Sequence, residues 1–244
     1  MWTFGFSDCC FCVFEIARFG FFVSGRCGSY PCGYIVCARV VRAAMVGVVQ
    51  YARLVLVPGS SGSWDGSPRS PFRAELRGSL ERELSTSSVS LGAGYAAGGC
   101  AARQSSLEVT LRRLRTGSGV AIGHSEGCAR LLHALRDRRN AAKLHTLVLI
   151  SPAYALRSVG AVDVEAMLRV AGGEVSRLLL VDTELGFGGS APEYAWPGTR
   201  GLLADAVRSN PRWQRCVVAG ASHSLRHGGA GAAERAIVEW ASLE

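Results

Sequence analysis

The chain of 244 residues is long enough for one sizeable α/β core and a small appendage, which excludes two full domains. Hydrophobic residues make up 48% of it, which excludes a wholly disordered chain, and the net charge of +8 comes from scattered arginines without a nucleic-acid-binding motif, so we expect no nucleic-acid partner. The single lysine, Lys143, has no glycine-rich loop or partner tyrosine beside it, which argues against Schiff-base chemistry and a phosphate-loop lysine.

The first segment, residues 1–32, is apolar, aromatic and rich in cysteine. Its cysteines lack the paired C-x-x-C spacing of a zinc site, so no metal is predicted. Charged residues interrupt the apolar run, which fits neither a signal peptide nor a membrane span. We expect a poorly ordered Cys-rich N-terminal extension over 1–32 and a folded domain over 33–244. Acylation of the cysteines, which would attach residues 1–25 to a membrane, is an alternative that the sequence leaves open.

Three later cysteines have the pattern of small buried thiols in a reducing compartment, which predicts a cytoplasmic protein. They are Cys100, Cys128 and Cys216.

From residue 33 onward, apolar strand patterns alternate with amphipathic helix patterns. The strands are continuous apolar runs, which are typical of a mostly parallel sheet covered on both faces. The pattern therefore predicts an α/β fold with a mostly parallel central sheet and helices on both faces. We expect strands at 34–41, 45–52, 54–57, 119–125, 144–151, 177–182 and 215–220, a short strand with a glycine loop over 87–99, and helices at 70–84, 106–116, 128–139, 163–172, 198–210 and 231–243.

The most specific motif is Gly-His-Ser-Glu-Gly at 123–127, which lies between a predicted strand and a predicted helix. In that context a G-x-S-x-G pattern indicates a nucleophile elbow. A tight strand-to-helix turn strains the central residue, and side chains two positions before and after it would collide with neighbouring elements. Ser125 is therefore the candidate nucleophile. A helix-capping serine is the alternative reading.

A serine nucleophile needs a base, and His223 follows the last predicted strand. A histidine in this place, after the serine in the chain, matches the order of serine hydrolases. His227 is the nearest competitor, whereas His124 adjoins the serine and is expected to point elsewhere. A surface histidine in a turn is the alternative reading.

The third member of a triad should be a carboxylate at the end of the predicted strand over 177–182. Asp182 comes directly off that strand, and Glu184 lies two residues into the loop. The sequence does not separate these two candidates. For the oxyanion hole we expect the backbone N–H groups of Glu126, which follows the nucleophile, and of Ser60 in the glycine- and serine-rich loop.

Five stretches together resemble the α/β-hydrolase superfamily over roughly residues 45–244: "VLVPGSSGSW", "AIGHSEG", "LVLISPAY", "LLLVDTE" and "VVAGASHSL". The resemblance is to small, nearly lidless serine hydrolases and esterases. It implies two-step acyl transfer by Ser125 and His223 with an acid, and no cofactor. The sequence departs from the pattern at Pro58-Gly59, where many members have His-Gly, and in the blurred position of the acid.

The interval between the strand ending at Ser151 and the next strand is too short for a large lid. We therefore expect an open pocket and a small ester substrate with a short acyl group; aromatic residues of the loops either line this pocket or serve only in packing. The aromatic candidates are Tyr154, Tyr194 and Trp196. The sequence does not predict the oligomeric state.

Two other functional classes remain. Gly92, Gly94 and Gly98 follow a predicted strand, as in the phosphate loop of an NAD(P)-binding oxidoreductase, but no acidic residue follows at the spacing that would bind the ribose. The third class is a non-catalytic protein that uses the hydrolase fold to bind a ligand or a partner, because a fold does not fix a function.

Overall fold

The computed structural model describes residues 2–6, 10–17, 20–26, 53–59, 72–89, 91, 95, 98–156, 160–187, 197–225 and 228–242. The chain divides into two compact units, Met1–Val48 and Val49–Glu244. The strands predicted over 34–41 and 45–52 lie outside the described residues, so the predicted start of the folded domain at residue 33 stays a prediction.

In the first unit the described backbone forms a three-stranded antiparallel sheet, and the extension expected over residues 1–32 stays a prediction. It consists of β1 (Trp2–Phe6), β2 (Cys10–Ala17) and β3 (Gly20–Arg26). Aromatic and β-branched residues, which are frequent in strands, make up much of this segment. Among the helices that the structure describes, none combines the length and the apolar character that crossing a membrane requires.

The second unit contains a six-stranded sheet in the order β11-β10-β7-β6-β4-β5, in which every pairing is parallel. This confirms the predicted α/β class with a parallel central sheet. The strands are β4 (Arg53–Val57), β5 (Ser87–Val89), β6 (Gly119–His124), β7 (Leu144–Ile150), β10 (Arg177–Thr183) and β11 (Trp213–Val218).

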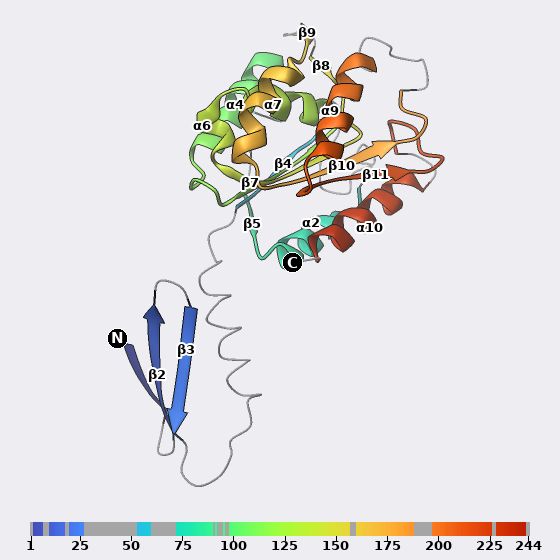
Figure 1. The fold of residues 1–244 in the computed structure, drawn as a ribbon. Helices are drawn as coiled ribbons and strands as arrows, with labels where there is room; N and C mark the ends of the chain where they lie inside the picture. The colour runs from blue at the N-terminus through green and yellow to red at the C-terminus, as the bar shows by residue number, and fades with distance from the viewer. Residues whose placement is uncertain are drawn as a thin grey trace. The chain divides into compact units, whose positions relative to one another are not determined.

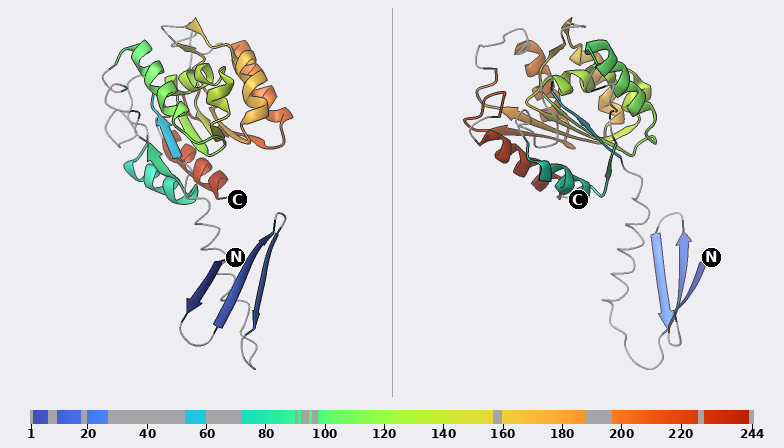
Figure 2. Two further views of the ribbon diagram at one scale, coloured as in Figure 1. Left: turned by 90° about the vertical axis from the view of Figure 1, so that its left-hand side faces the viewer. Right: turned by 180° about the vertical axis from the view of Figure 1, so that it is seen from behind.

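Helices cover both faces of this sheet, because successive side chains of each strand point to opposite faces and both sets are apolar (Figure 1). In β6, Ala121 packs in one core and Ile122 in the other. The two views in Figure 2 show the same two helical layers. The helices of the first core are α4 (Cys100–Arg112), α5 (Glu126–Ala134), α7 (Val164–Glu174) and α9 (Pro197–Ser209), and those of the second are α2 (Ala74–Glu83) and α10 (Gly229–Ala241).

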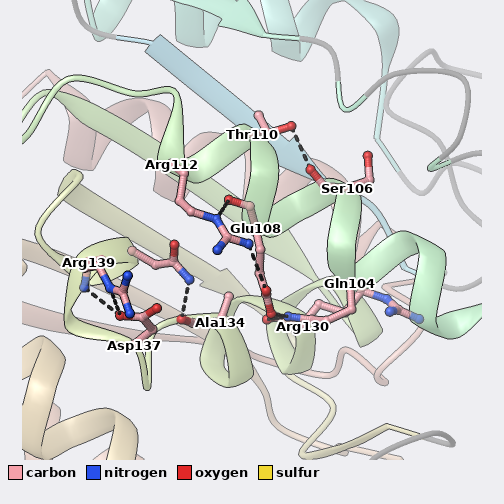
Figure 3. Close-up of polar contacts among 10 residues, drawn as sticks. Gln104, Ser106, Glu108, Thr110, Arg112, Arg130, Ala134, Asp137 and Arg139 are labelled. Carbon is pink, nitrogen blue, oxygen red and sulfur yellow. Dashed lines mark hydrogen bonds and ion pairs between the residues drawn. The ribbon is translucent and has the colours of Figure 1, made fainter.

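Two helices differ most from the predicted ones. The helix predicted to begin at residue 106 begins at Cys100. Its first turns were missed because small residues precede its apolar positions and the apolar periodicity is weak there. The single helix predicted over 128–139 is two helices, α5 and the short α6 (Arg138–Ala141). Asp137 caps the second, since its carboxylate accepts a hydrogen bond from the N–H of Arg139 (Figure 3).

The interval before β10 is described at residues 151–156 and 160–176, where its elements are two short strands and one helix of 11 residues. It holds the two-stranded antiparallel sheet of β8 (Ala155–Leu156) and β9 (Gly160–Ala161), followed by α7.

On the second face of the sheet, α10 contacts the start of α2 through a buried carboxylate. Glu234 of α10 is only 3% exposed. It accepts hydrogen bonds from the backbone N–H of Arg73 at 2.8 Å and from the side-chain Nε of Arg73 at 2.7 Å. Arg73 is the residue before α2 and makes no side-chain cap of its own, so Glu234 satisfies a backbone N–H at the start of that helix.

Candidate active site

Ser125 lies at the turn between β6 and α5, where the backbone is strained. Its φ and ψ angles are 53° and −119°, a conformation that non-glycine residues rarely adopt. The turn is held by the backbone on both sides: the N–H of Ser125 donates to the carbonyl of Ile150 at 3.0 Å, and its own carbonyl accepts from Ala153 at 3.1 Å. These bonds to the segment after β7 fix the serine at the carboxyl edge of the sheet.

The two glycines that flank the serine are required by packing. A Cβ atom at Gly127 would lie 2.1 Å from the carbonyl oxygen of Val57. A Cβ atom at Gly123 would lie 2.8 Å from the side chain of Leu131 and 2.9 Å from the backbone N of Cys128. The helix α5 therefore packs directly against β4 and β6, as the motif predicts.

The structure brings Ser125 and His223 together, although 98 positions separate them in the chain. The Oγ atom of Ser125 lies 2.7 Å from Nε2 of His223. The loop after β11 carries the histidine, and its backbone pairs with the loop after β10, since the N–H of His223 donates to the carbonyl of Gly186 at 2.7 Å. A hydroxyl and an imidazole at this distance can exchange a proton.

The His223 ring is largely shielded from water. Phe187 stacks on it with ring centroids 3.6 Å apart, and the ring of His124 lies 6.3 Å away on a nearly parallel plane. Burial lowers the pKa of His223 from 6.5 to about 4, because a charged imidazolium loses its hydration there. The ring is therefore neutral at pH 7, which is the form that accepts a proton.

The second nitrogen of the ring faces a hydroxyl that sequence reasoning did not single out. Nδ1 of His223 lies 2.9 Å from Oγ of Ser151, the residue that follows β7. The Oγ atom of Ser151 is also 3.1 Å from the backbone carbonyl oxygen of His223 and 3.4 Å from Oγ1 of Thr183. The one sequence signal for Ser151 is its place at the end of a buried strand.

Neither predicted acid is bonded to His223. The carboxylate of Asp182 is 4% exposed and forms ion pairs with Arg200 at 3.0 Å and Arg215 at 2.7 Å. Its Oδ1 atom also accepts from the backbone N–H of Thr183. Glu184 is exposed and accepts from the N–H of Gly220 at 2.7 Å. Within the described residues, the hydrogen bonds of the His223 ring are those to Ser125 and Ser151.

Of the two predicted oxyanion donors, only one lies in the described part of the chain. Glu126 is the first residue of α5, and the first N–H groups of a helix have no partner within it. Its side chain pairs with Arg130, which is fully buried. Ser60 lies outside the described residues, but Gly59 before it approaches the serine closely, since a Cβ atom there would be 3.2 Å from Cβ of Ser125.

The expectation that Tyr154 lines the pocket is wrong. It is 2% exposed and packs in the first core. Burial raises the pKa of its hydroxyl, which has no hydrogen-bond partner among the described residues. The other two aromatic candidates, Tyr194 and Trp196, lie outside the described residues, and so does His227. Of the glycine pattern that suggested a dinucleotide site, Gly92 and Gly94 also lie outside them.

The cysteines and possible metal ligands add no further centre within the residues that the structure describes. No group of three or more His, Cys, Asp or Glu side chains is placed to hold a metal ion there. Cys128 is buried, as expected, and its Sγ donates to the carbonyl of Ile150, whereas Cys100 and Cys216 are half-buried; all three are free thiols.

The strand order, with the serine after β6 and the histidine after the edge strand β11, is that of the α/β-hydrolase fold. No protein-family model matches the chain, and no curated protein matches it.

Several solved structures are similar to this chain. Est1E from Butyrivibrio proteoclasticus has a TM-score of 0.48 at 12% identity, over 79% of this chain and 87% of that one. An α/β serine hydrolase homologue from Coxiella burnetii has a TM-score of 0.44 at 14% identity, over 78% and 84%. The haloalkane dehalogenase DbeA-M1 loop variant from Bradyrhizobium elkanii has a TM-score of 0.46 at 11% identity, over 79% and 89%.

Proposed function

We propose that this chain is a serine hydrolase that cleaves small carboxylic esters through an acyl-enzyme. The observation that supports this proposal is the 2.7 Å contact between Oγ of Ser125 and Nε2 of His223 at a strained strand-to-helix turn. Backbone strain of this kind is maintained only where the surrounding structure enforces it, and it is concentrated at functional sites.

In the proposed reaction, Oγ of Ser125 attacks the ester carbonyl while Nε2 of His223 accepts the hydroxyl proton. The tetrahedral intermediate then collapses, the alkoxide leaves with the proton from His223, and the acyl group stays on the serine. Water, deprotonated by the same nitrogen, attacks the acyl-enzyme; the bond between the acyl carbon and Oγ of Ser125 then breaks, Oγ takes the proton back from His223, and the carboxylic acid is released. The chemistry is complete with these groups and water, so the proposal includes no cofactor.

The negative charge of the intermediate would be held by the N–H of Glu126 and, from the loop after β4, the N–H of Ser60. Each such donor contributes on the order of 3 kcal/mol in the transition state. Two features support the first donor: it is the opening N–H of α5, and the ion pair with the buried Arg130 fixes the residue that carries it. A positive helix N-terminus also favours an oxyanion there.

The test is hydrolysis of p-nitrophenyl acetate together with labelling by a fluorophosphonate probe. We expect the wild-type protein to turn over the ester and to be labelled at one serine, and Ser125→Ala to lose both properties. Ser209→Ala, which removes an exposed hydroxyl at the end of α9, is the matched control and should behave as wild type. Equal hydrolysis by the wild type and Ser125→Ala would refute the proposal.

One observation favours a second candidate, a non-catalytic binding protein on the same fold. Within the described residues, His223 has no carboxylate partner, and such a partner is what stabilises the imidazolium in serine hydrolases. A protein that is silent toward both the ester and the probe, while it remains folded, would support this alternative.

A further inference from the structure

Ser151 is held rigidly on the side of His223 that faces away from the nucleophile. Its side chain is 2% exposed, and its backbone has a φ angle of 44°, in the left-handed region. The N–H of Ser151 donates to the carbonyl of Val181 at 2.7 Å, which ties it to the next strand. The hydroxyl therefore has little freedom to turn away from the ring.

One arrangement of protons places a hydrogen in each of the three contacts around the ring, because it leaves the Ser151 hydroxyl free to donate to the carbonyl oxygen of His223. The hydroxyl of Ser125 donates to Nε2, which must then be unprotonated in the neutral ring. The proton of the ring lies on Nδ1, which donates to Oγ of Ser151 at 2.9 Å. The hydroxyl of Ser151 in turn donates to the carbonyl oxygen of His223 at 3.1 Å. Every donor in this series of three hydrogen bonds has an acceptor.

We propose that Ser151 is the positioning residue of the site: its hydroxyl fixes His223 in the tautomer that presents an unprotonated Nε2 to Ser125. This inference rests on the proposed function, because the tautomer matters catalytically only if Ser125 is the nucleophile. A carboxylate has this role in the triad that the sequence predicts, and here a neutral hydroxyl replaces it. Ser151 acts through the histidine and does not touch the reacting atoms.

The environment of the neighbouring acid supports this assignment. Asp182 ends up on the same sheet edge, but two arginines and the N–H of Thr183 take both of its oxygen atoms. The hydroxyl of Thr183 instead lies 3.4 Å from Oγ of Ser151. The residues that could connect the acid to the ring are therefore a serine and a threonine, both buried and both uncharged.

A neutral positioning residue has a chemical consequence. It selects the tautomer, but it does not stabilise the positive imidazolium that forms when His223 accepts the proton. Among the described residues, the titratable ring that faces His223 is that of His124, with ring centroids 6.3 Å apart, and the carboxylates of Asp182 and Glu184 are bonded elsewhere. Placing a carboxylate at position 151 should therefore raise the pH at which the histidine becomes protonated.

The first test measures the tautomer of His223 directly, by ¹⁵N NMR of the full-length protein at pH 7. We expect a protonated Nδ1 and an unprotonated Nε2 in the wild type, and a mixture of both tautomers in Ser151→Ala. Ser222→Ala, which removes a neighbouring hydroxyl that faces Ser224, should keep the wild-type tautomer. A wild-type ring protonated on Nε2 would overturn the proposal, even if the variant failed to fold.

The second test measures kcat/KM for the ester against pH. Loss of the hydrogen bond in Ser151→Ala should lower kcat on the order of tenfold to hundredfold with little change in KM. Ser151→Asp, in which aspartate tolerates the left-handed backbone, should shift the acidic limb upward by about one pH unit or more. An unchanged kcat in folded Ser151→Ala, or an unshifted limb in folded Ser151→Asp, would contradict the proposal.

The two tests separate this inference from the proposed function. If the protein hydrolyses no ester but shows the expected tautomer and its loss in Ser151→Ala, the proposed function fails and only the assignment of the tautomer to Ser151 stands. If the protein is an active esterase whose tautomer and kcat do not depend on Ser151, the positioning role fails and the proposed function stands.

Discussion

The ends of strands β6 and β10 lie at the same edge of the sheet, yet they differ in how directly the sequence encodes them. At the end of β6, the strained serine and both glycines have the geometry that the motif predicts. At the end of β10, the two candidate acids face other partners. The conformation of the β6 turn is determined by steric constraints within five residues, so a local motif predicts it. The partner of a charged side chain depends on every group that competes for it, and these groups come from distant parts of the sequence.

The composition of the chain explains part of this competition. It has 27 Lys and Arg residues against 19 Asp and Glu, so basic side chains are in excess around each carboxylate. Asp182 is held by Arg200 from helix α9 and by Arg215 from strand β11. A buried carboxylate with two guanidinium partners is satisfied in place. The histidine is left with the hydroxyl of Ser151.

The largest effect should follow from disturbing the β6 turn. In Gly127→Ala the new Cβ would overlap the carbonyl oxygen of Val57, since the ideal position is 2.1 Å from it. We expect the free energy of unfolding to fall by about 4 kcal/mol, measured by urea denaturation. Gly172→Ala is the control, because a Cβ at this position of α7 meets nothing within 4 Å and alanine favours the helix by about 1 kcal/mol. Equal stability of the two variants would show that the turn is not sterically determined.

A smaller loss of stability should follow at the β10 end. Asp182→Asn leaves Arg200 and Arg215 without their carboxylate, which should lower the free energy of unfolding by about 3 kcal/mol. We expect kcat for the ester, per folded molecule, to stay within about threefold of wild type, because Asp182 is not bonded to His223. A thousandfold loss of kcat with unchanged stability would identify Asp182 as the catalytic acid and remove the contrast between the two strand ends.

The half-buried histidine before the nucleophile, His124, should make stability depend on pH. Burial lowers the pKa of His124 from 6.5 to about 3, so the unfolded chain binds a proton there that the folded chain does not. The stability that depends on a neutral His124 is therefore complete above pH 6.5 and is lost as the pH falls from 6.5 toward 3. In His124→Phe, the loss of unfolding free energy between pH 7.5 and 4.5 should be about 3 kcal/mol smaller than in wild type. Identical losses in urea titrations of both proteins would mean that His124 titrates normally.

The smallest effect is expected at Glu184. This residue is exposed, and a glutamine oxygen can still accept the hydrogen bond from Gly220. Glu184→Gln should therefore change the free energy of unfolding by less than about 0.5 kcal/mol and kcat by less than about twofold. A large fall in kcat would instead return Glu184 to the role that the sequence suggested.

The parts of the structure that were predictable are those set by local patterns. Apolar runs gave the strands of the sheet, and glycines at 123 and 127 gave the turn. The split of α5 from α6 was missed, because the cap at Asp137 is a single residue within an otherwise helical pattern.

Ser151 was missed for a different reason. A serine at the end of a strand has no motif, and its role depends on the packing of β7 between β6 and β10. Because β7 lies between β6 and β10, the hydroxyl of Ser151 reaches both His223 and Thr183. A survey of every hydroxyl and carboxylate at the ends of the strands predicted over 119–125, 144–151 and 177–182 would have included Ser151.

The bond between Glu234 and Arg73 has a consequence for the order in which the chain assembles. The N–H at the start of α2 finds its acceptor on a residue made 161 positions later. The apolar side chains of α2, which include Leu76 and Leu80, share their core with Ile237 and Trp240 of α10. During synthesis on the ribosome, the part of this face that α10 covers therefore stays exposed until α10 has emerged, and exposed apolar surface makes an unfinished chain prone to aggregation.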